Sequence, residues 1–338
     1  MKLSNPIRWF SLLVGAMAFA SGVFSQGDKT QADNDEFALS TPGPVPFPAN
    51  NPYSKDKANL GKLLFADGRL SRTGVTPCTW CHDPNRGFGD DRTISIGDTK
   101  EALNRHSPGL YNVGYLKHLF WDGRAATLEE QAIFPIKHPK EMAMNLDDLP
   151  ARLVKGGYEM QFNKAFGSKE ITVERVAMAL ATYERTITQN NTPFDHWLKG
   201  EKNAMSKDAI AGLELFKGKA KCIDCHAGPH FSKAFTDKGP VYKNTGVYQS
   251  PVLDPDPGRM AIERSNPEVR DAFKIPTLRG VGRNEPFMHN GSIATLEEVV
   301  DFYNRGGDKG KLKKLNLTDV EKRQLVEFLR NGITNQDE

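Results

Sequence analysis

Two short stretches, Cys78-Thr-Trp-Cys-His82 and Cys222-Ile-Asp-Cys-His226, decide the fold of this 338-residue chain. Together they use all four cysteines of the sequence, and a histidine follows each second cysteine at once. The C-x-x-C-H pattern is typical of haem c, whose vinyl groups bond to two thiols and whose iron binds the adjacent imidazole. A zinc site is the alternative, but it does not need a histidine directly after the second cysteine. The sequence therefore predicts two covalently bound haem c groups, with these attachment residues and iron ligands: Cys78, Cys81, Cys222 and Cys225, and His82 and His226.

An internal repeat surrounds these motifs. The motifs lie 144 residues apart, whereas a second match, between residues 107–114 and 275–282, has an offset of 168 residues. The same offset of 168 relates Thr127-Leu-Glu-Glu130 to Thr295-Leu-Glu-Glu298. The second half therefore contains an insertion of 24 residues, which we assign to the Pro- and Asp-rich stretch at about 236–272.

The repeated Thr-x-x-Glu segments are typical of helix starts, because the threonine can cap free backbone N–H groups while the glutamate reaches back. After Thr295, the residues Leu296, Val299, Val300 and Tyr303 have the spacing of one helix face. Other predicted helices are Val173–Thr188, Lys207–Phe216 and Asp319–Asn331. Few segments resemble strands, so we expect a mostly α fold of two tandem cytochrome c-like domains, related by internal duplication and each with one haem c.

The N-terminus resembles a cleaved signal peptide over residues 1–25. Lys2 and Arg8 precede an apolar run that is too short to span a bilayer comfortably, although an uncleaved anchor is the alternative. The following polar and Pro-rich residues, 26–48, predict a flexible leader. These features predict export to the periplasm without stable membrane insertion. The net charge of +3 and the lack of Lys/Arg runs argue against nucleic acid as a partner.

From about Asn50 to the C-terminus, the chain resembles the bacterial dihaem cytochrome c peroxidase/MauG family. The resemblance rests on the duplicated haem motifs, on Phe120-Trp-Asp-Gly-Arg124, and on Pro276-Thr-Leu-Arg279 followed by Pro286-Phe-Met-His-Asn-Gly291. It implies a peroxidatic haem in an N-terminal domain, residues 49–195, and an electron-transfer haem in a C-terminal domain, residues 196–338.

The resemblance also implies an active-site trio. The family's tryptophan between the haems matches Trp121, its distal glutamine matches Gln131, and its catalytic glutamate matches Glu141. A carboxylate beside the iron can take a proton from one peroxide oxygen and give one to the other. Taken alone, however, Glu141 could lie in a solvated loop, Trp121 in the core and Gln131 on a helix surface.

Two departures point toward the MauG-like branch. Many dihaem peroxidases bind a histidine to the resting peroxidatic iron, but residues 96–98 contain none, which implies an open coordination position. The distal methionine of the second haem is replaced by Tyr303, a hard anionic ligand that favours Fe(III). By the 168-residue offset, Tyr303 corresponds to Pro135, and a core position is the alternative for Tyr303. The surface tryptophan that MauG uses for long-range oxidation is Ala220 in this chain.

The family resemblance further implies a calcium ion between the domains. Pro286 matches one carbonyl donor, and Asn284 stands where a threonine carbonyl usually serves. The usual asparagine side-chain donor aligns with His106, which is a poor calcium ligand. The sequence therefore leaves the calcium ion open.

Three functions remain possible from the sequence. The first is a periplasmic oxidoreductase that reduces hydrogen peroxide to water with electrons from a small cytochrome c or cupredoxin. The second is a MauG-like oxidase that uses a two-haem high-valent state to oxidise a protein or other substrate. The third is a non-catalytic dihaem electron carrier, which requires two six-coordinate haems and gives Glu141 no role.

Overall fold

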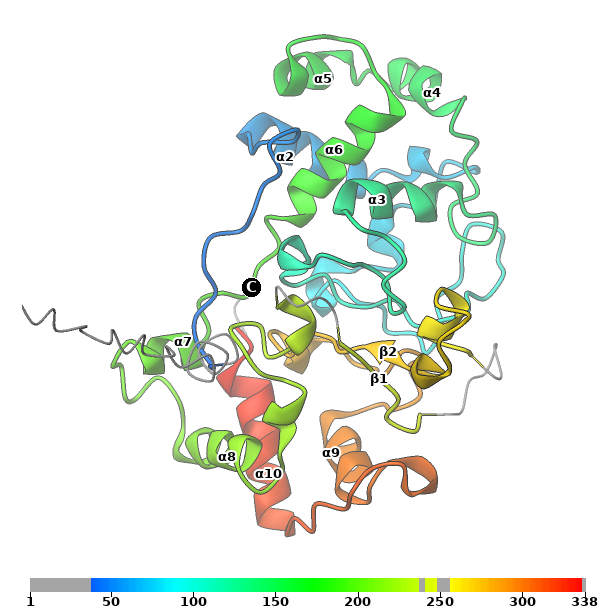
Figure 1. Ribbon diagram of the computed structural model, residues 1–338. Helices are drawn as coiled ribbons and strands as arrows, with labels where there is room; N and C mark the ends of the chain where they lie inside the picture. The colour runs from blue at the N-terminus through cyan, green and yellow to red at the C-terminus, as the bar shows by residue number, and fades with distance from the viewer. Residues whose placement is uncertain (1–37, 237–240, 248–255, 336–338) are drawn as a thin grey trace, which may run out of the picture. The chain divides into compact units, whose positions relative to one another are not determined.

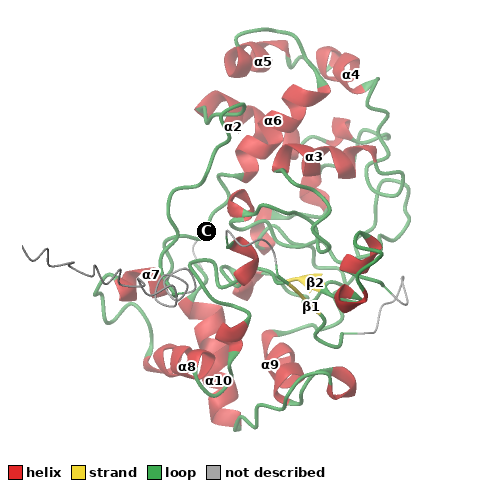
Figure 2. Ribbon diagram, in the orientation of Figure 1, coloured by secondary structure: helices red, strands yellow, loops and turns green. Residues whose placement is uncertain are grey.

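The computed structural model describes residues 38–236, 241–247 and 256–335. Within these ranges the chain is mostly helical, with helices α2 to α10, short 3-10 turns and one sheet of two short strands (Figures 1 and 2). The predicted mostly α fold is therefore confirmed. The predicted signal peptide, residues 1–25, lies outside the described residues. Among the helices of the described part, none is long and apolar enough to cross a membrane.

In the first half, the helix before the haem motif packs closely on a second helix. Helix α2 (Lys55–Phe65) is capped by Ser54, and α6 (Val173–Glu184) is capped by Thr172. The two helices cross at Gly61, where an added Cβ would lie 2.0 Å from the carbonyl oxygen of Ala179. Only a residue without a side chain permits this approach, so Gly61 fixes the crossing point.

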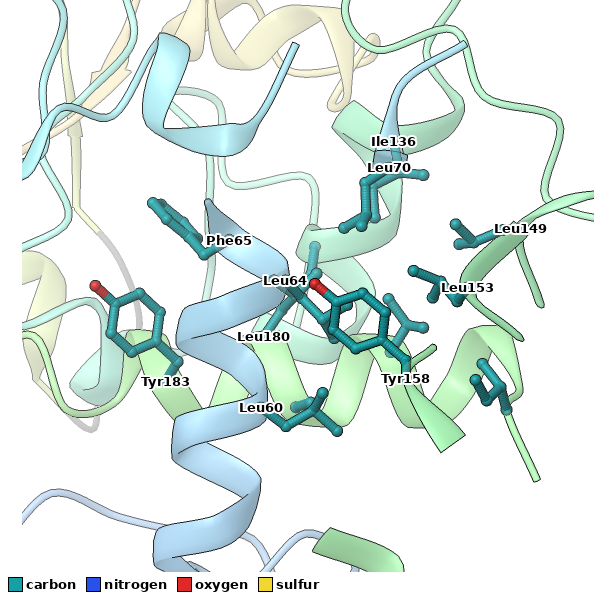
Figure 3. Packing of buried hydrophobic residues seen from close by; sticks show 14 of the residues in the cluster. Leu60, Leu64, Phe65, Leu70, Ile136, Leu149, Leu153, Tyr158, Leu180 and Tyr183 are labelled. Atoms are coloured by element: carbon teal, nitrogen blue, oxygen red, sulfur yellow. The ribbon is translucent and has the colours of Figure 1, made fainter. Parts of the chain in front are cut away.

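The first hydrophobic core forms around this crossing. Leu60 and Leu64 of α2 pack with Leu180 of α6, and all three side chains are almost completely buried (Figure 3). Helices α4 (Leu149–Lys155) and α5 (Glu159–Phe166) add Leu153 and Phe162 to the same cluster.

The second half repeats this arrangement. Helix α8 (Lys207–Lys217) lies beside α10 (Asp319–Glu327), and an added Cβ at Gly212 would lie 2.0 Å from the carbonyl oxygen of Gln324 (Figure 1). A separate core of buried residues includes Leu213, Phe216 and Phe328. The close crossing of α2 on α6 thus has a counterpart in that of α8 on α10.

A further pair of helices follows the 168-residue offset. Thr127 caps α3 (Leu128–Lys137) and Thr295 caps α9 (Leu296–Asn304), each accepting a hydrogen bond from the glutamate N–H three residues later. The glutamate carboxylates, Glu130 and Glu298, accept in return from the backbone N–H four residues earlier, at 2.8 and 2.9 Å. Isolated bridges Leu119–Ala125 and Phe287–Ile293 precede the two helices at the same offset. The sequence repeat thus has a structural counterpart.

The predicted domain boundary at residues 195/196 falls inside the short helix α7 (Pro193–Leu198). Phe194 of this helix already belongs to the second core. Asp195 accepts two hydrogen bonds from Arg279, at 2.7 and 2.9 Å, and both side chains are fully buried. The boundary itself remains a prediction.

Two other segments bear on the site. The strands β1 (Tyr242–Lys243) and β2 (Phe273–Lys274) pair antiparallel; β1 lies within the insertion, and β2 directly follows it. The described end of the predicted leader is held by contacts, because Leu39 packs on the second core and the Ser40 carbonyl accepts from Arg279 at 3.1 Å.

The α2–α6 crossing can be tested by Gly61→Ala. The new methyl group would overlap the Ala179 carbonyl, so the free energy of unfolding should fall by about 2–3 kcal/mol in urea denaturation followed by far-UV circular dichroism. Gly43→Ala is the matched control, because nothing lies within 4 Å of its added Cβ. Equal stabilities of the two variants would contradict the close crossing.

Candidate haem cavity

Each C-x-x-C-H segment folds into the same tight turn. Short 3-10 turns cover Cys78–Trp80 and Cys222–Asp224. The backbone N–H of His82 donates to the Cys78 carbonyl at 3.0 Å, and that of His226 donates to the Cys222 carbonyl at 2.8 Å. These bonds hold both sulfurs and the imidazole of each motif in one compact segment.

The two histidine rings are oriented by backbone carbonyls. His82 Nδ1 lies 2.9 Å from the Phe88 carbonyl oxygen, and His226 Nδ1 lies 2.9 Å from that of Phe231. A carbonyl can only accept, so Nδ1 carries the proton and Nε2 keeps a free lone pair, as an iron ligand requires. Burial lowers the pKa of both imidazoles, that of His226 to about 4, which keeps the rings neutral.

A cavity of about 590 Å³ adjoins the first motif, within the size range of cofactor sites. Cys78, Cys81 and His82 line it, together with residues from α3, the Trp121 loop and α6. Burial raises the pKa of all four cysteine thiols, to about 11 at Cys81 and about 12 at Cys222.

Glu141 lines this cavity from the turn after α3. Its N–H donates to the His138 carbonyl at 3.0 Å, and its carbonyl accepts from the N–H of Asp98 at 2.6 Å. Burial raises the pKa of the Glu141 carboxyl, while the charges of His138 and Arg124 act in the opposite direction. A carboxyl with a raised pKa beside a cavity holds a proton more readily than an exposed one, which suits a group that exchanges protons.

Trp121 and Gln131 line the same cavity, so the structure brings together the three residues predicted for catalysis. The indole N–H of Trp121 donates to the His106 carbonyl at 2.9 Å. Gln131 lies on α3, with its backbone N–H bonded to the Thr127 carbonyl at 2.9 Å. Pro135, one turn further along α3, also lines the cavity.

Two buried charged groups at the cavity were not predicted from the sequence. Glu184 ends α6, its Oε2 has no hydrogen-bond partner, and burial raises the pKa of its carboxyl to about 8. Lys274 of β2 is buried at the same cavity, and burial lowers the pKa of its ammonium to about 8. A haem carries propionate carboxylates, for which a buried ammonium is a suitable partner. The residues of the cavity therefore fit a haem.

In the sequence, Lys274 and Glu184 can be recognised as charged residues that lie next to apolar ones. Lys274 stands between Phe273 and Ile275, and Glu184 follows the apolar face of α6. Such residues are rarely buried without a partner, so their positions indicate a polar group on the other side.

Tyr303 lies near the end of α9, at the position in the repeat that Pro135 occupies in α3. Burial raises the pKa of its phenol, and the Cys222 and Cys225 sulfurs add to this effect because they lie nearby. Tyr303 is therefore close to the second haem motif. A phenol in these surroundings stays protonated unless a metal ion displaces the proton.

The residues considered for calcium lie in a different setting. His106 is buried, and its Nδ1 lies 3.1 Å from the Arg92 carbonyl oxygen. The buried Oδ1 of Asn284 has no hydrogen-bond donor, and its side chain lies against Gly87 and Gly109. In the part of the chain that the structure describes, no three His, Cys, Asp or Glu side chains are grouped to hold a metal ion. The donors expected at Asn284 and Pro286 are backbone carbonyls, which these side-chain observations do not test, so the calcium ion stays a prediction.

Comparisons with known proteins identify a family. The family described as Di-haem cytochrome c peroxidase matches residues 55–203. The methylamine utilization protein MauG of Methylorubrum extorquens is 37% identical over 96% of this chain and 93% of that protein. The cytochrome c551 peroxidase of Nitrosomonas europaea is 36% identical over 90% of this chain and 85% of that protein.

Similar folds are found among solved structures. A MauG-like protein associated with microbial copper homeostasis superimposes with a TM-score of 0.81 at 30% identity, covering 88% of this chain and 94% of that chain. The diheme peroxidase BthA from Burkholderia thailandensis has a TM-score of 0.71 at 24% identity, covering 85% of this chain and 87% of that chain. The second likeness concerns the fold alone.

Proposed function

The chain belongs to the dihaem cytochrome c peroxidase and MauG family, and we propose that it reduces hydrogen peroxide to water. A small redox protein, a cytochrome c or a cupredoxin, supplies the electrons. One observation carries the proposal: the first haem motif, Trp121, Gln131 and Glu141 line one cavity. A plain electron carrier has no use for an acid–base carboxyl beside its haem. We propose a periplasmic location from the basic and apolar N-terminal sequence.

Two haem c groups are proposed, one in each domain. Cys78 and Cys81 would hold the first through thioethers, with His82 on its iron, and Cys222, Cys225 and His226 would hold the second. The haem iron supplies electrons for cleavage of the O–O bond. The overall reaction takes two electrons and two protons and converts one peroxide into two water molecules.

Glu141 supplies the proton transfers. Its carboxylate takes the proton from one peroxide oxygen, and the resulting carboxyl returns a proton to the other oxygen, which leaves as water. The raised pKa of Glu141 supports this role, because an acid–base group works best when its pKa lies near the working pH. The proton that Glu141 moves is the peroxide's own, so both protons of the overall reaction enter from solvent, which the 23% exposed side chain can reach.

Gln131 and Trp121 assist without exchanging protons with peroxide. The Gln131 amide can donate a hydrogen bond to a peroxide oxygen, which orients it toward Glu141. The Trp121 ring lies at the cavity, while its carbonyl accepts from Lys274 N–H of the second half at 2.8 Å. This double contact supports Trp121 as the electron path between the two haem domains.

A MauG-like oxidase is the second candidate function, and Tyr303 is the observation that favours it. As a sixth ligand, its phenolate oxygen would close the second iron, whereas Pro135 offers no ligand to the first. Ala220 weighs against an oxidation route like that of MauG, because this position has no ring and is 4% exposed. An oxidised protein substrate would therefore need another contact surface.

Glu141→Gln should lower the rate of peroxide turnover by about 100-fold, the usual size of general acid–base catalysis, without loss of either haem. In the native protein the rate should fall as the pH drops through the raised pKa of Glu141, because the base is then protonated. That acid limb should be absent in the variant.

The control for this variant is Glu101→Gln, which removes an exposed carboxylate that pairs with Lys140 at 3.2 Å near the same loop. Steady-state peroxide kinetics with a reduced cytochrome c measure both variants. Native kinetics in Glu141→Gln would rule out its acid–base role.

Tyr303→Phe tests the ligand of the second haem. Loss of an anionic donor should raise the midpoint potential of one haem by on the order of 0.1 V, within the range of about 0.8 V that axial ligands span. Fully oxidised native protein should also consume peroxide without prior reduction, an ability that the variant should lose. Potentiometric titration against Tyr53→Phe, an exposed control, measures the shift. Identical potentials in all three proteins would show that Tyr303 is only a core residue.

A further inference from the structure

One arginine joins the two halves beside the cavity. Arg105 Nε and Nη2 donate to Asp256 at 2.7 and 2.8 Å, and Nη1 donates to Asp122 at 2.7 Å. The Arg105 side chain is 14% exposed, and both carboxylates are 5% exposed. Asp122 follows Trp121, whereas Asp256 belongs to the insertion of the second half. Asp122 also pairs with Arg124 at 2.8 Å. Because Arg105 and Asp256 are largely removed from water, breaking the pair between them is costly.

The insertion contacts the same loop at two more places. Arg259 Nη1 donates to the backbone carbonyls of Asp122 and Gly123, at 2.7 and 3.2 Å. The Tyr242 ring packs on Gly123 so closely that an added Cβ would lie 1.9 Å from its hydroxyl oxygen. The loop after Trp121 is therefore held by side chains of the second half.

Hydrogen bonds hold Trp121 itself from both halves. Its indole N–H donates to the carbonyl of His106, which follows Arg105 in the chain. Its own carbonyl accepts from the N–H of Lys274. The first bond ends one residue after Arg105. The second comes from β2, which the Gly258–Ala272 bridge joins to the segment that carries Asp256.

Ring contacts surround Trp121 on a further side. Its ring meets His289 edge to face, with centroids 6.5 Å apart, and His289 stacks on Phe273 at 3.6 Å. The guanidinium of Arg105 lies over the Phe273 ring, 5.3 Å from its centroid. Arg105 thus touches the supports of the Trp121 ring as well as those of its backbone.

We propose that Arg105 and Asp256 are positioning residues that hold Trp121 in the geometry needed for electron transfer between the haems. This inference rests on the proposed function, in which Trp121 is the electron path. It gives the insertion a role: a segment of the second half completes a site in the first. Functional side chains must be held within about 0.5 Å of the productive geometry, so a loosened loop should slow transfer before it unfolds the protein.

Asp256→Asn removes the carboxylate charge that pairs with Arg105 and changes little else in the side chain. In the native protein the Gly258 N–H donates to the Asp256 carboxylate at 2.9 Å. The asparagine keeps a side-chain oxygen that can accept this bond, so the local turn can still form. The matched control is Glu297→Gln, which breaks another two-pronged pair, with Arg330 at 2.7 and 3.0 Å, on an exposed surface. Both variants lose one carboxylate charge that faces an arginine.

Three measurements on the protein with its haems test the proposal. Rapid photoreduction without peroxide gives the rate of electron transfer between haems, which should fall by about tenfold or more in Asp256→Asn, as expected for a misplaced functional group. Hydrogen exchange at the Lys274 amide should quicken by a similar factor. In peroxide turnover, kcat should fall with KM unchanged. The control should match the native protein in all three.

Unchanged transfer and exchange rates in Asp256→Asn would overturn the proposal. A lower melting temperature alone would not rescue it, because loss of an ordinary structural ion pair also lowers the melting temperature. If Asp256→Asn does not fold, Arg105→Lys takes its place, since it keeps the charge but loses the two-pronged geometry. The proposed function has its own test: it fails if the native protein does not consume peroxide. The transfer and exchange rates test the positioning role independently of peroxide turnover.

Discussion

A hydrogen bond from each haem-motif histidine to a backbone carbonyl is the constraint on which the site depends. The tight C-x-x-C-H turn fixes the backbone of His82, but its imidazole ring could still rotate about the side-chain bonds. The Phe88 carbonyl holds Nδ1 and so directs the unprotonated Nε2 away from it. Phe88 has a φ of 58°, and its counterpart Phe231 has a φ of 50°. Both halves therefore adopt the same uncommon backbone conformation to present this carbonyl.

The two halves share a framework and differ at one position that we propose to lie over the haem iron. Thr127 and Thr295 begin equivalent helices with the same cap, so equivalent positions along α3 and α9 face equivalent places. At one such position the first half has Pro135 and the second has Tyr303. A proline has no donor atom in its side chain, whereas a phenolate is a strong ligand for Fe(III). Under the proposed function, this single difference within a duplicated scaffold would close one iron and leave the other open.

Local patterns in the sequence predicted much of this. The cysteine and histidine spacing defines the haem motifs, and the Thr-x-x-Glu caps place α3 and α9 correctly. Helix α9 begins at Leu296, α6 at Val173 and α10 at Asp319, as predicted, although α6 ends four residues early at Glu184. These features succeed because each depends on residues within a few positions of one another.

What the sequence did not predict depends on contacts between distant residues. Arg105 and Asp256 are 151 positions apart, and neither lies in a recognisable motif. Lys274 is buried, and the partner that suits it is a haem propionate. A group that is not part of the chain leaves no signal in the sequence. Gly61 carries no signal of its own, since a glycine inside a helix is interpretable only once Ala179 is known to cross there.

The EPR spectrum of the fully oxidised protein tests the central claim most directly. Two ferric signals of equal intensity are expected. A high-spin signal should come from the iron that only His82 binds, and a low-spin signal from the iron closed by His226 and Tyr303. Two low-spin signals, or the signal of a single haem, would contradict an enzyme with one open and one closed iron.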